Sequence, residues 1–152
     1  MQLVVLGLNH RSAAVEVRER FSFEKNEVES ALNRLYEYEK ISECVILSTC
    51  NRTEIYAVLE DVQSPKAYML DVLKHLKHAD TIDESAFFFY EEKACIEHLF
   101  RVSASLDSLV LGEGQILSQL KGAYIAAYSA GFTGTVFNIL FQRAIGVGKK
   151  VR

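Results

Sequence analysis

Two short apolar runs enclose a polar stretch in the first half of the chain, and this arrangement limits how the chain can fold. The runs cover residues 44–47 and 55–59, and both are rich in apolar or β-branched side chains and short enough to be strands. The polar residues between them include short hydrogen-bonding side chains that favour turns. The pattern therefore predicts two buried strands joined at a polar turn.

Cys50 lies within this turn, where a cysteine can be exposed while its flanks are held rigidly. Arg52 stands two residues away, and a nearby cation stabilises the thiolate, which is the reactive form of cysteine. Thr49 and Asn51 add short hydrogen-bonding groups on either side. Free cysteines are also common as small buried residues, so an inert Cys50 is the alternative. The residue types make Cys50 a candidate acyl-accepting nucleophile.

Strand-like and helix-like segments alternate up to residue 90. Ser22 is a plausible N-cap for the first helix. The order β-α-β-β-α-β is that of a ferredoxin-like unit with an antiparallel sheet, so the predicted class is α+β. The expected elements are a strand at 3–8, a helix at about 28–36, strands at 44–47 and 55–59, a helix opened by Ser64 and Pro65, and a strand at 87–90.

From residue 91 onward the pattern changes to helices alone. The last helix is still periodic at Arg152 and shows no C-terminal stop signal, so we expect the natural chain to continue. We predict an α+β subdomain at 1–90 and a helical subdomain at 91–152. The helices are expected at 91–105, from about 112, and from about 135, the last with a core stripe of Val136, Ile139, Leu140, Ala144, Val147 and Val151.

His98 falls on the apolar face of the helix expected at 91–105. A lone histidine on such a face is more often a satisfied core residue than a catalyst, and both interpretations stay open on the pattern alone. His75 and His78 are three residues apart on another helix, but no further ligand accompanies them, so no metal site is predicted.

Gly112 and Gly114 invite comparison with a phosphate-binding loop. Leu117, however, occupies the position of the last glycine in the G-x-G-x-x-G pattern. No cofactor-binding site is therefore predicted within these residues.

The net charge of −3 hides an uneven distribution of charge along the chain. Residues 114–152 carry five basic side chains and no acidic one, whereas the first 113 residues carry 12 basic and 20 acidic side chains. Such asymmetry can mark a surface for a polyanion. A helical region with a basic solvated face explains the asymmetry equally well.

The bulk composition is that of an ordinary globular domain, with 49% hydrophobic and 24% charged residues. The N-terminus lacks the basic start of a signal peptide, and no apolar run is long enough to span a bilayer. Three cysteines without paired spacing favour a reducing compartment. We therefore expect a cytoplasmic protein.

Three blocks of sequence together resemble glutamyl-tRNA reductase. They are residues 8–13 (LNHRSA), 48–54 (STCNRTE) and 105–117 (SLDSLVLGEGQIL). The resemblance covers essentially the whole chain, and the last two blocks are specific to that family. It implies that residues 1–152 are the N-terminal catalytic domain of such an enzyme, which an NADPH-binding domain and a dimerising helical domain would follow.

The resemblance also implies a reaction and a set of roles. Members of the family convert glutamyl-tRNA and NADPH to glutamate 1-semialdehyde, the first committed step of tetrapyrrole synthesis. Cys50 matches the nucleophile, which forms a thioester, and His98 matches the histidine near the reacting ester. Gly114 stands where many members have proline, and Ser118 where many have glycine, but neither change removes a reacting group. The residues that match the substrate pocket are Thr49, Asn51, Arg52, Ser108, Glu113, Gly114, Gln115 and Gln119.

The implied partners are glutamyl-tRNA, a second copy of the protein bound through a missing C-terminal domain, and glutamate-1-semialdehyde aminomutase as a channelling partner. NADPH would be bound by a domain outside this chain, so residues 1–152 alone are not expected to complete the reduction. No metal is implied. Two other functions fit the residues: a non-catalytic ferredoxin-like module that binds a ligand or RNA, and a stand-alone cysteine esterase.

Overall fold

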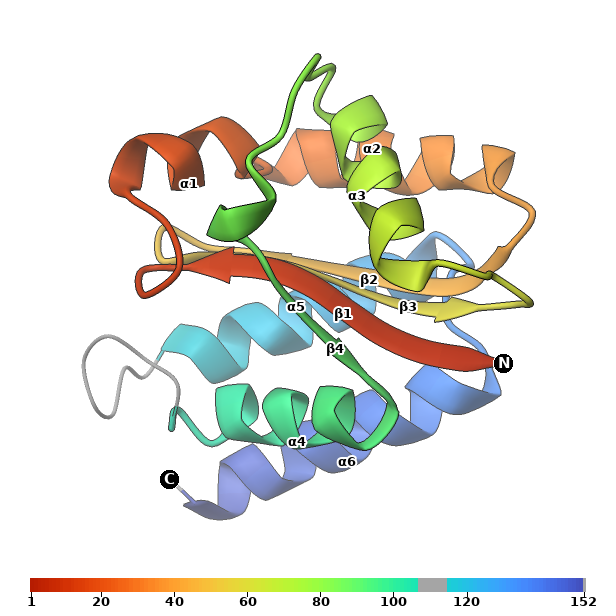
Figure 1. The fold of residues 1–152 in the computed structure, drawn as a ribbon. Helices are drawn as coiled ribbons and strands as arrows, with labels where there is room; N and C mark the ends of the chain where they lie inside the picture. The colour runs from red at the N-terminus through yellow and green to blue at the C-terminus, as the bar shows by residue number, and fades with distance from the viewer. Residues whose placement is uncertain (107–114, 152) are drawn as a thin grey trace.

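The computed structural model describes residues 1–106 and 115–151, which form a four-stranded sheet with helices on both faces (Figure 1). The helices and strands, in chain order, are β1 (Gln2–Asn9), α1 (Val15–Phe21), α2 (Lys25–Arg34), η1 (Leu35–Glu37), β2 (Ile41–Ser48), β3 (Arg52–Leu59), α3 (Pro65–Leu76), η2 (Glu84–Ala86), β4 (Phe88–Glu91), α4 (Glu92–Ser103), α5 (Gln115–Ser129) and α6 (Thr135–Val151).

The strands form one sheet in the order β2-β3-β1-β4, and every neighbouring pair is antiparallel. Helices α1, α2 and α3 cover one face, and α4, α5 and α6 cover the other (Figure 1). The predicted combination of helices with an antiparallel sheet is confirmed, whereas its ferredoxin-like assignment stays a prediction. The sheet lies within residues 2–91, and helices α4, α5 and α6 of the predicted helical subdomain (91–152) pack against one of its faces. The division into subdomains at 1–90 and 91–152 stays a prediction.

Alternation of side chains along β1 explains why the sheet is buried on both faces. Val4 and Leu6 enter a core beneath α1, α2 and α3, whereas Leu3 and Val5 enter a second core beneath α4, α5 and α6. A polar side chain on a central strand is therefore taken out of water, and it needs a polar partner within the protein.

The helix boundaries agree with the sequence at Pro65 but not at Ser22. Pro65 opens α3, with Ser64 at the N-cap position, as predicted. The assignment of Ser22 as an N-cap is wrong, because its backbone N–H and its hydroxyl both donate to the carbonyl of Glu19 and so end α1. The N-cap of α2 is Glu24, which forms a capping box with Glu27.

The predicted core stripe of α6 is also wrong in part. Ile139, Val147 and Val151 are exposed. The buried residues of α6 do recur at helical spacing, but exposed apolar residues lie beside that face, and the predicted stripe follows those exposed residues in part. The described helices include none long and apolar enough to cross a membrane. The residues of α6 that are buried are Phe137, Phe141, Ala144, Ile145 and Gly148.

One edge of the fold collects the residues that the sequence singled out. The register of the sheet pairs Asn9, the last residue of β1, with Arg52, the first residue of β3. The turn that carries Cys50 therefore lies beside the loop that follows β1, so residues distant in sequence can share one site.

Candidate active site

Strand β3 presents three polar side chains to the face covered by α4. Arg52, Glu54 and Tyr56 alternate along the strand and therefore share that face. All three are buried, with exposed fractions of 2%, 0% and 0%. A buried charge is stable only when it is paired and hydrogen-bonded, so these groups must satisfy one another.

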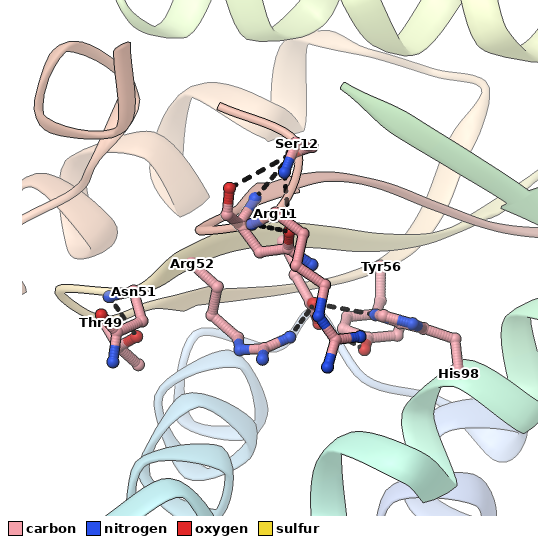
Figure 2. A network of polar contacts seen from close by, with 9 residues as sticks. Arg11, Ser12, Thr49, Asn51, Arg52, Tyr56 and His98 are labelled. Atoms are coloured by element: carbon pink, nitrogen blue, oxygen red, sulfur yellow. Dashed lines mark hydrogen bonds and ion pairs between the residues drawn. The ribbon is translucent and has the colours of Figure 1, made fainter. Parts of the chain in front are cut away.

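The carboxylate of Glu54 is the centre of this polar cluster and has three side-chain partners. Arg52 Nη1 donates to Glu54 Oε2 at 2.9 Å, and His98 Nε2 of α4 donates to the same oxygen at 2.8 Å. The Tyr56 hydroxyl donates to the other oxygen, Oε1, at 2.6 Å. Figure 2 shows the side chains of Arg52 and His98 entering this cluster from opposite sides.

These contacts decide which groups of the cluster carry charge. Burial by itself raises the pKa of the Glu54 carboxyl, but the interactions with His98, Arg52 and Tyr56 hold that pKa below its ordinary value. Burial and the neighbouring Glu54 carboxylate raise the pKa of Tyr56 well above its ordinary value. Glu54 is therefore an ionised acceptor, and Tyr56 is a neutral donor.

His98 points inward, as its place on the apolar face predicted, and it is 7% exposed. Its ring lies among aromatic rings, with centroids 4.9 Å from Phe88 and 5.2 Å from Tyr90. Because Nε2 faces a carboxylate, Nε2 carries the proton, and in a neutral imidazole Nδ1 is then the acceptor. The ring is thus a buried group whose Nε2 is satisfied and whose orientation is fixed by Glu54.

Gly7 allows this cluster to close over the sheet. It pairs with Glu54 of β3 on one side and with Phe88 of β4 on the other. A Cβ atom at Gly7 would lie 2.6 Å from Phe88 Cζ and 2.9 Å from the Thr53 carbonyl oxygen. The absence of a side chain at this central position therefore leaves room for the ring of Phe88 next to Glu54.

Cys50 occupies the turn between β2 and β3, and its side chain is exposed. The Thr49 N–H donates to the Arg52 carbonyl at 2.8 Å, and Thr49 Oγ1 accepts from the Asn51 N–H at 3.2 Å. These bonds hold both flanks of the cysteine, as a positioned nucleophile requires.

The other two cysteines are shielded. Cys44 and Cys95 are both fully buried in the structure. Burial raises the pKa of the Cys44 thiol to about 12, and burial also raises the pKa of Cys95. A thiol that stays protonated is a poor nucleophile, so Cys50 is the one cysteine of the three placed to react.

Helix α5 contributes the two glutamines of the predicted substrate pocket. Gln115 is exposed at the start of the helix, and Gln119 is half-buried one turn later. Gln119 Oε1 is buried and accepts no hydrogen bond from the described residues. Gln119 lines a cavity of about 340 Å³ together with Ser48, at the end of β2.

The structure thus brings Thr49, Asn51, Arg52 and His98 to one edge of the fold. The predicted substrate residues Ser108, Glu113 and Gly114 lie outside the described residues.

The sequence pattern alone does not predict the partners that hold this site together. The sequence pattern predicts no role for Glu54, Asn9 or Tyr56, and it places Arg11 only at the end of a strand, where it could face a site or make loop contacts. Asn9 Oδ1 accepts hydrogen bonds from the backbone N–H groups of Arg11 (2.9 Å) and Ser12 (3.1 Å), which shapes the loop after β1. One signal was available: polar residues at every second position of an otherwise apolar strand, from Arg52 to Tyr56.

Comparisons with known proteins agree on one family. A family model described as "Glutamyl-tRNAGlu reductase, N-terminal domain" matches residues 6–152. The glutamyl-tRNA reductase of Bacillus subtilis (strain 168) is 42% identical over 151 residues, 99% of this chain and 33% of that protein. The enzyme of the same name from Listeria welshimeri is 43% identical over 152 residues, 99% of this chain and 35% of that protein.

A similar solved structure belongs to the same family. Glutamyl-tRNA reductase from Methanopyrus kandleri superimposes with a TM-score of 0.79 and 34% sequence identity, covering 99% of this chain and 34% of that chain. The chain therefore spans about a third of the length of the relatives that it matches.

Proposed function

Because the chain belongs to the glutamyl-tRNA reductase family, matching its N-terminal domain, we propose that it transfers the glutamyl group of glutamyl-tRNA to Cys50. The observation that carries the proposal is one exposed cysteine in a hydrogen-bonded turn that leads directly into β3, the strand that holds Arg52 and the His98 partner Glu54. The product of this transfer is a thioester, as expected for a cysteine that acts as a covalent catalyst.

The proposed step moves one acyl group and one proton. The Cys50 thiolate attacks the carbonyl carbon of the ester, a sulfur–carbon bond forms, and the bond from that carbon to the ribose oxygen breaks. The leaving ribose oxygen then takes up a proton. His98 is suited to pass it on at Nδ1, since its other nitrogen, Nε2, is held by the Glu54 carboxylate and the ring is thereby oriented.

Glutamate recognition is assigned to residues around the turn. On the family match, Arg52 is proposed to bind a substrate carboxylate, because a guanidinium can pair with a carboxylate through two parallel N–H donors. The buried Oε1 of Gln119 is an acceptor suited to an ammonium or hydroxyl group. The further pocket residues proposed on the family match are Thr49, Asn51, Ser108, Glu113, Gly114 and Gln115.

NADPH is the proposed reductant of the thioester, with glutamate 1-semialdehyde as the product, but the described residues do not fit this cofactor. Dinucleotides bind beyond the carboxyl ends of parallel strands, at a glycine-rich turn. The strand pairs described in this chain are all antiparallel. We therefore expect the reductant to be held elsewhere in the protein. Homodimerisation through a C-terminal domain and channelling to glutamate-1-semialdehyde aminomutase also stay proposals.

Mass spectrometry of the acid-quenched protein after exposure to glutamyl-tRNA, without NADPH, tests the proposal. We expect a mass increase of one glutamyl group, mapped to the peptide that contains Cys50, and none in Cys50→Ala. Binding of tRNA without covalent label would favour the non-catalytic module. Equal reaction with unrelated activated esters would favour the cysteine esterase.

A further inference from the structure

We propose that the cavity beside His98 is the subsite for the terminal nucleoside of glutamyl-tRNA, an inference that rests on the proposed function above. This cavity has a volume of about 210 Å³ and is lined by Asn9, Arg11, Ser12, Phe88, Tyr90 and His98. Of these residues, His98 alone belongs to the site proposed for the ester chemistry. The other five come from the end of β1, the loop that follows it and edge strand β4.

The size of the cavity limits the ligand. Pockets for drug-sized molecules usually enclose roughly 300–1,000 Å³, so 210 Å³ suits a single nucleoside rather than a dinucleotide. The rest of a tRNA would extend outward from this point.

The aromatic part of the lining suits a nucleobase. Tyr90 is 38% exposed, and its ring stacks on Phe88 with centroids 5.2 Å apart and an angle of 26° between the ring planes. Proteins commonly bind unpaired bases by stacking them on such rings. The position of Phe88 depends on the open space over Gly7, so the sheet itself holds this stack in place.

The polar part of the lining suits the sugar and phosphate. Arg11 stands on the loop shaped by Asn9, and Figure 2 shows its side chain extending toward Arg52 and His98. A guanidinium binds phosphate oxygens through paired N–H donors. The hydroxyl of Ser12 stands on the same loop and is bonded to Asn9. A base stack, a cation and a hydroxyl within one small cavity are the groups that recognise a nucleotide.

The connection to the reacting ester makes a tRNA terminus the favoured source of that nucleotide. His98 lines the cavity and also binds Glu54, and Asn9 of the cavity pairs in the sheet with Arg52, two residues from Cys50. A nucleoside bound here places its ribose next to His98, with the ester directed toward the Cys50 turn. The same ring can then protonate the ribose oxygen that leaves.

The test compares two acyl donors in single-turnover acylation of Cys50 by the protein without NADPH. One donor is glutamyl-tRNA, and the other is a glutamate α-thioester that has no nucleoside. In Tyr90→Ala we expect the ratio of the two acylation rate constants to fall about tenfold, as loss of one base-stacking contact predicts. Arg11→Gln should lower the same ratio. The matched controls Tyr128→Ala and Arg143→Gln change exposed side chains on α5 and α6 and should leave the ratio unchanged.

Each outcome decides between the proposals. An unchanged ratio in Tyr90→Ala and Arg11→Gln, with Cys50 still acylated by both donors, overturns the nucleoside subsite and leaves the proposed function intact. Absence of Cys50 acylation by either donor in the parent protein overturns the proposed function and the subsite with it. Adenosine monophosphate is the probe for a free nucleotide: if it inhibits the parent through Tyr90 while the ratio is unchanged, the cavity binds free nucleotides and not the tRNA terminus.

Discussion

Glu54 and His98 form a buried hydrogen bond of 2.8 Å between Oε2 and Nε2, and this bond joins the central strand β3 to helix α4. The carboxylate is 0% exposed and the imidazole 7% exposed, so neither group relies on water for its partner. Arg52 shares the same oxygen at 2.9 Å. One carboxylate therefore orients two side chains of the candidate site and compensates the charge of a buried guanidinium.

Glu54→Gln should destabilise the fold and slow acylation together. The amide cannot balance the buried Arg52 guanidinium, and breaking a buried ion pair typically costs about 3–5 kcal/mol. Urea denaturation followed by circular dichroism measures the free energy of unfolding. Glu60→Gln is the matched control at a half-exposed glutamate, where the expected change is within about 0.5 kcal/mol. A Glu54→Gln protein as stable as the parent would contradict the central role of this carboxylate.

The pH dependence of stability should also depend on Glu54. Its pKa in the folded protein lies below the ordinary value of 4.5, so its contribution to stability is fully present above that value. This contribution is lost as the pH falls through the lowered pKa of the folded state. We expect the difference in unfolding free energy between the parent and Glu54→Gln to be constant near neutral pH and to shrink below about pH 4.5. If this difference in unfolding free energy grew as the pH fell, the pKa of Glu54 would be raised in the folded protein and not lowered.

Glu43 should prove important for anchoring α6, although the two are more than 90 residues apart in sequence. Its Oε1 accepts hydrogen bonds from the backbone N–H groups of Gly134 (2.6 Å) and Phe137 (2.8 Å), and its Oε2 accepts one from Val136 (3.3 Å). The side chain of β2 thus satisfies N–H groups at the N-terminus of α6 and lies at the positive end of its dipole. Glu43→Ala should lower the unfolding free energy by about 1–3 kcal/mol, measured by urea denaturation. Glu29→Ala, at an exposed position of α2, is the control.

Much of the fold followed from local pattern, and the errors have physical causes. The strands at 44–47 and 55–59 were predicted because short apolar runs around a polar turn have few other solutions. The predicted buried face of α6 is wrong in part because exposed apolar residues such as Ile139 and Val147 lie beside the true face, and the apolar pattern alone admits a stripe that includes them. Its neighbours are a distant strand residue, Glu43, and the backbone of α4, where a Cβ on Gly148 would lie 2.6 Å from the Ser103 carbonyl oxygen.

The candidate site was predictable only in part for a similar reason. Cys50 was identified because its type and its turn are both visible in sequence, and its exposure agrees with that prediction. The role of Glu54 depends on pairing across 44 residues with His98. The register of strand pairing places Gly7 beside Glu54 and Phe88 in the sheet. This register cannot be read from a single sequence.

Gly7→Ala should destabilise the fold and displace the side chain of Phe88 next to the candidate site. The added methyl group would lie 2.6 Å from Phe88 Cζ and 2.9 Å from the Thr53 carbonyl oxygen, and a backbone atom on a central strand cannot move away easily. Overpacking of this kind costs roughly 1–3 kcal/mol. The control is Gly146→Ala in α6, where nothing lies within 4 Å of the new Cβ and the expected effect is a gain of about 0.5–1 kcal/mol. In thermal unfolding, the Tm of Gly7→Ala should fall below that of the parent, and the Tm of Gly146→Ala should rise above it.

Cys50→Ser should keep the fold and lose acyl transfer. The two side chains are close in size, and Cys50 is exposed, so the unfolding free energy should change by less than about 0.5 kcal/mol. A serine hydroxyl is a weak nucleophile unless a base removes its proton. The imidazole of His98 is already oriented by Glu54 and is not bonded to this turn in any contact of the described residues.

Acid trapping after exposure to radiolabelled glutamyl-tRNA should give label on the parent and none on Cys50→Ser. Cys44→Ser, at a buried position, is the control that should keep the label if it folds. Equal label on parent and a correctly folded Cys50→Ser would assign the acyl group to another residue.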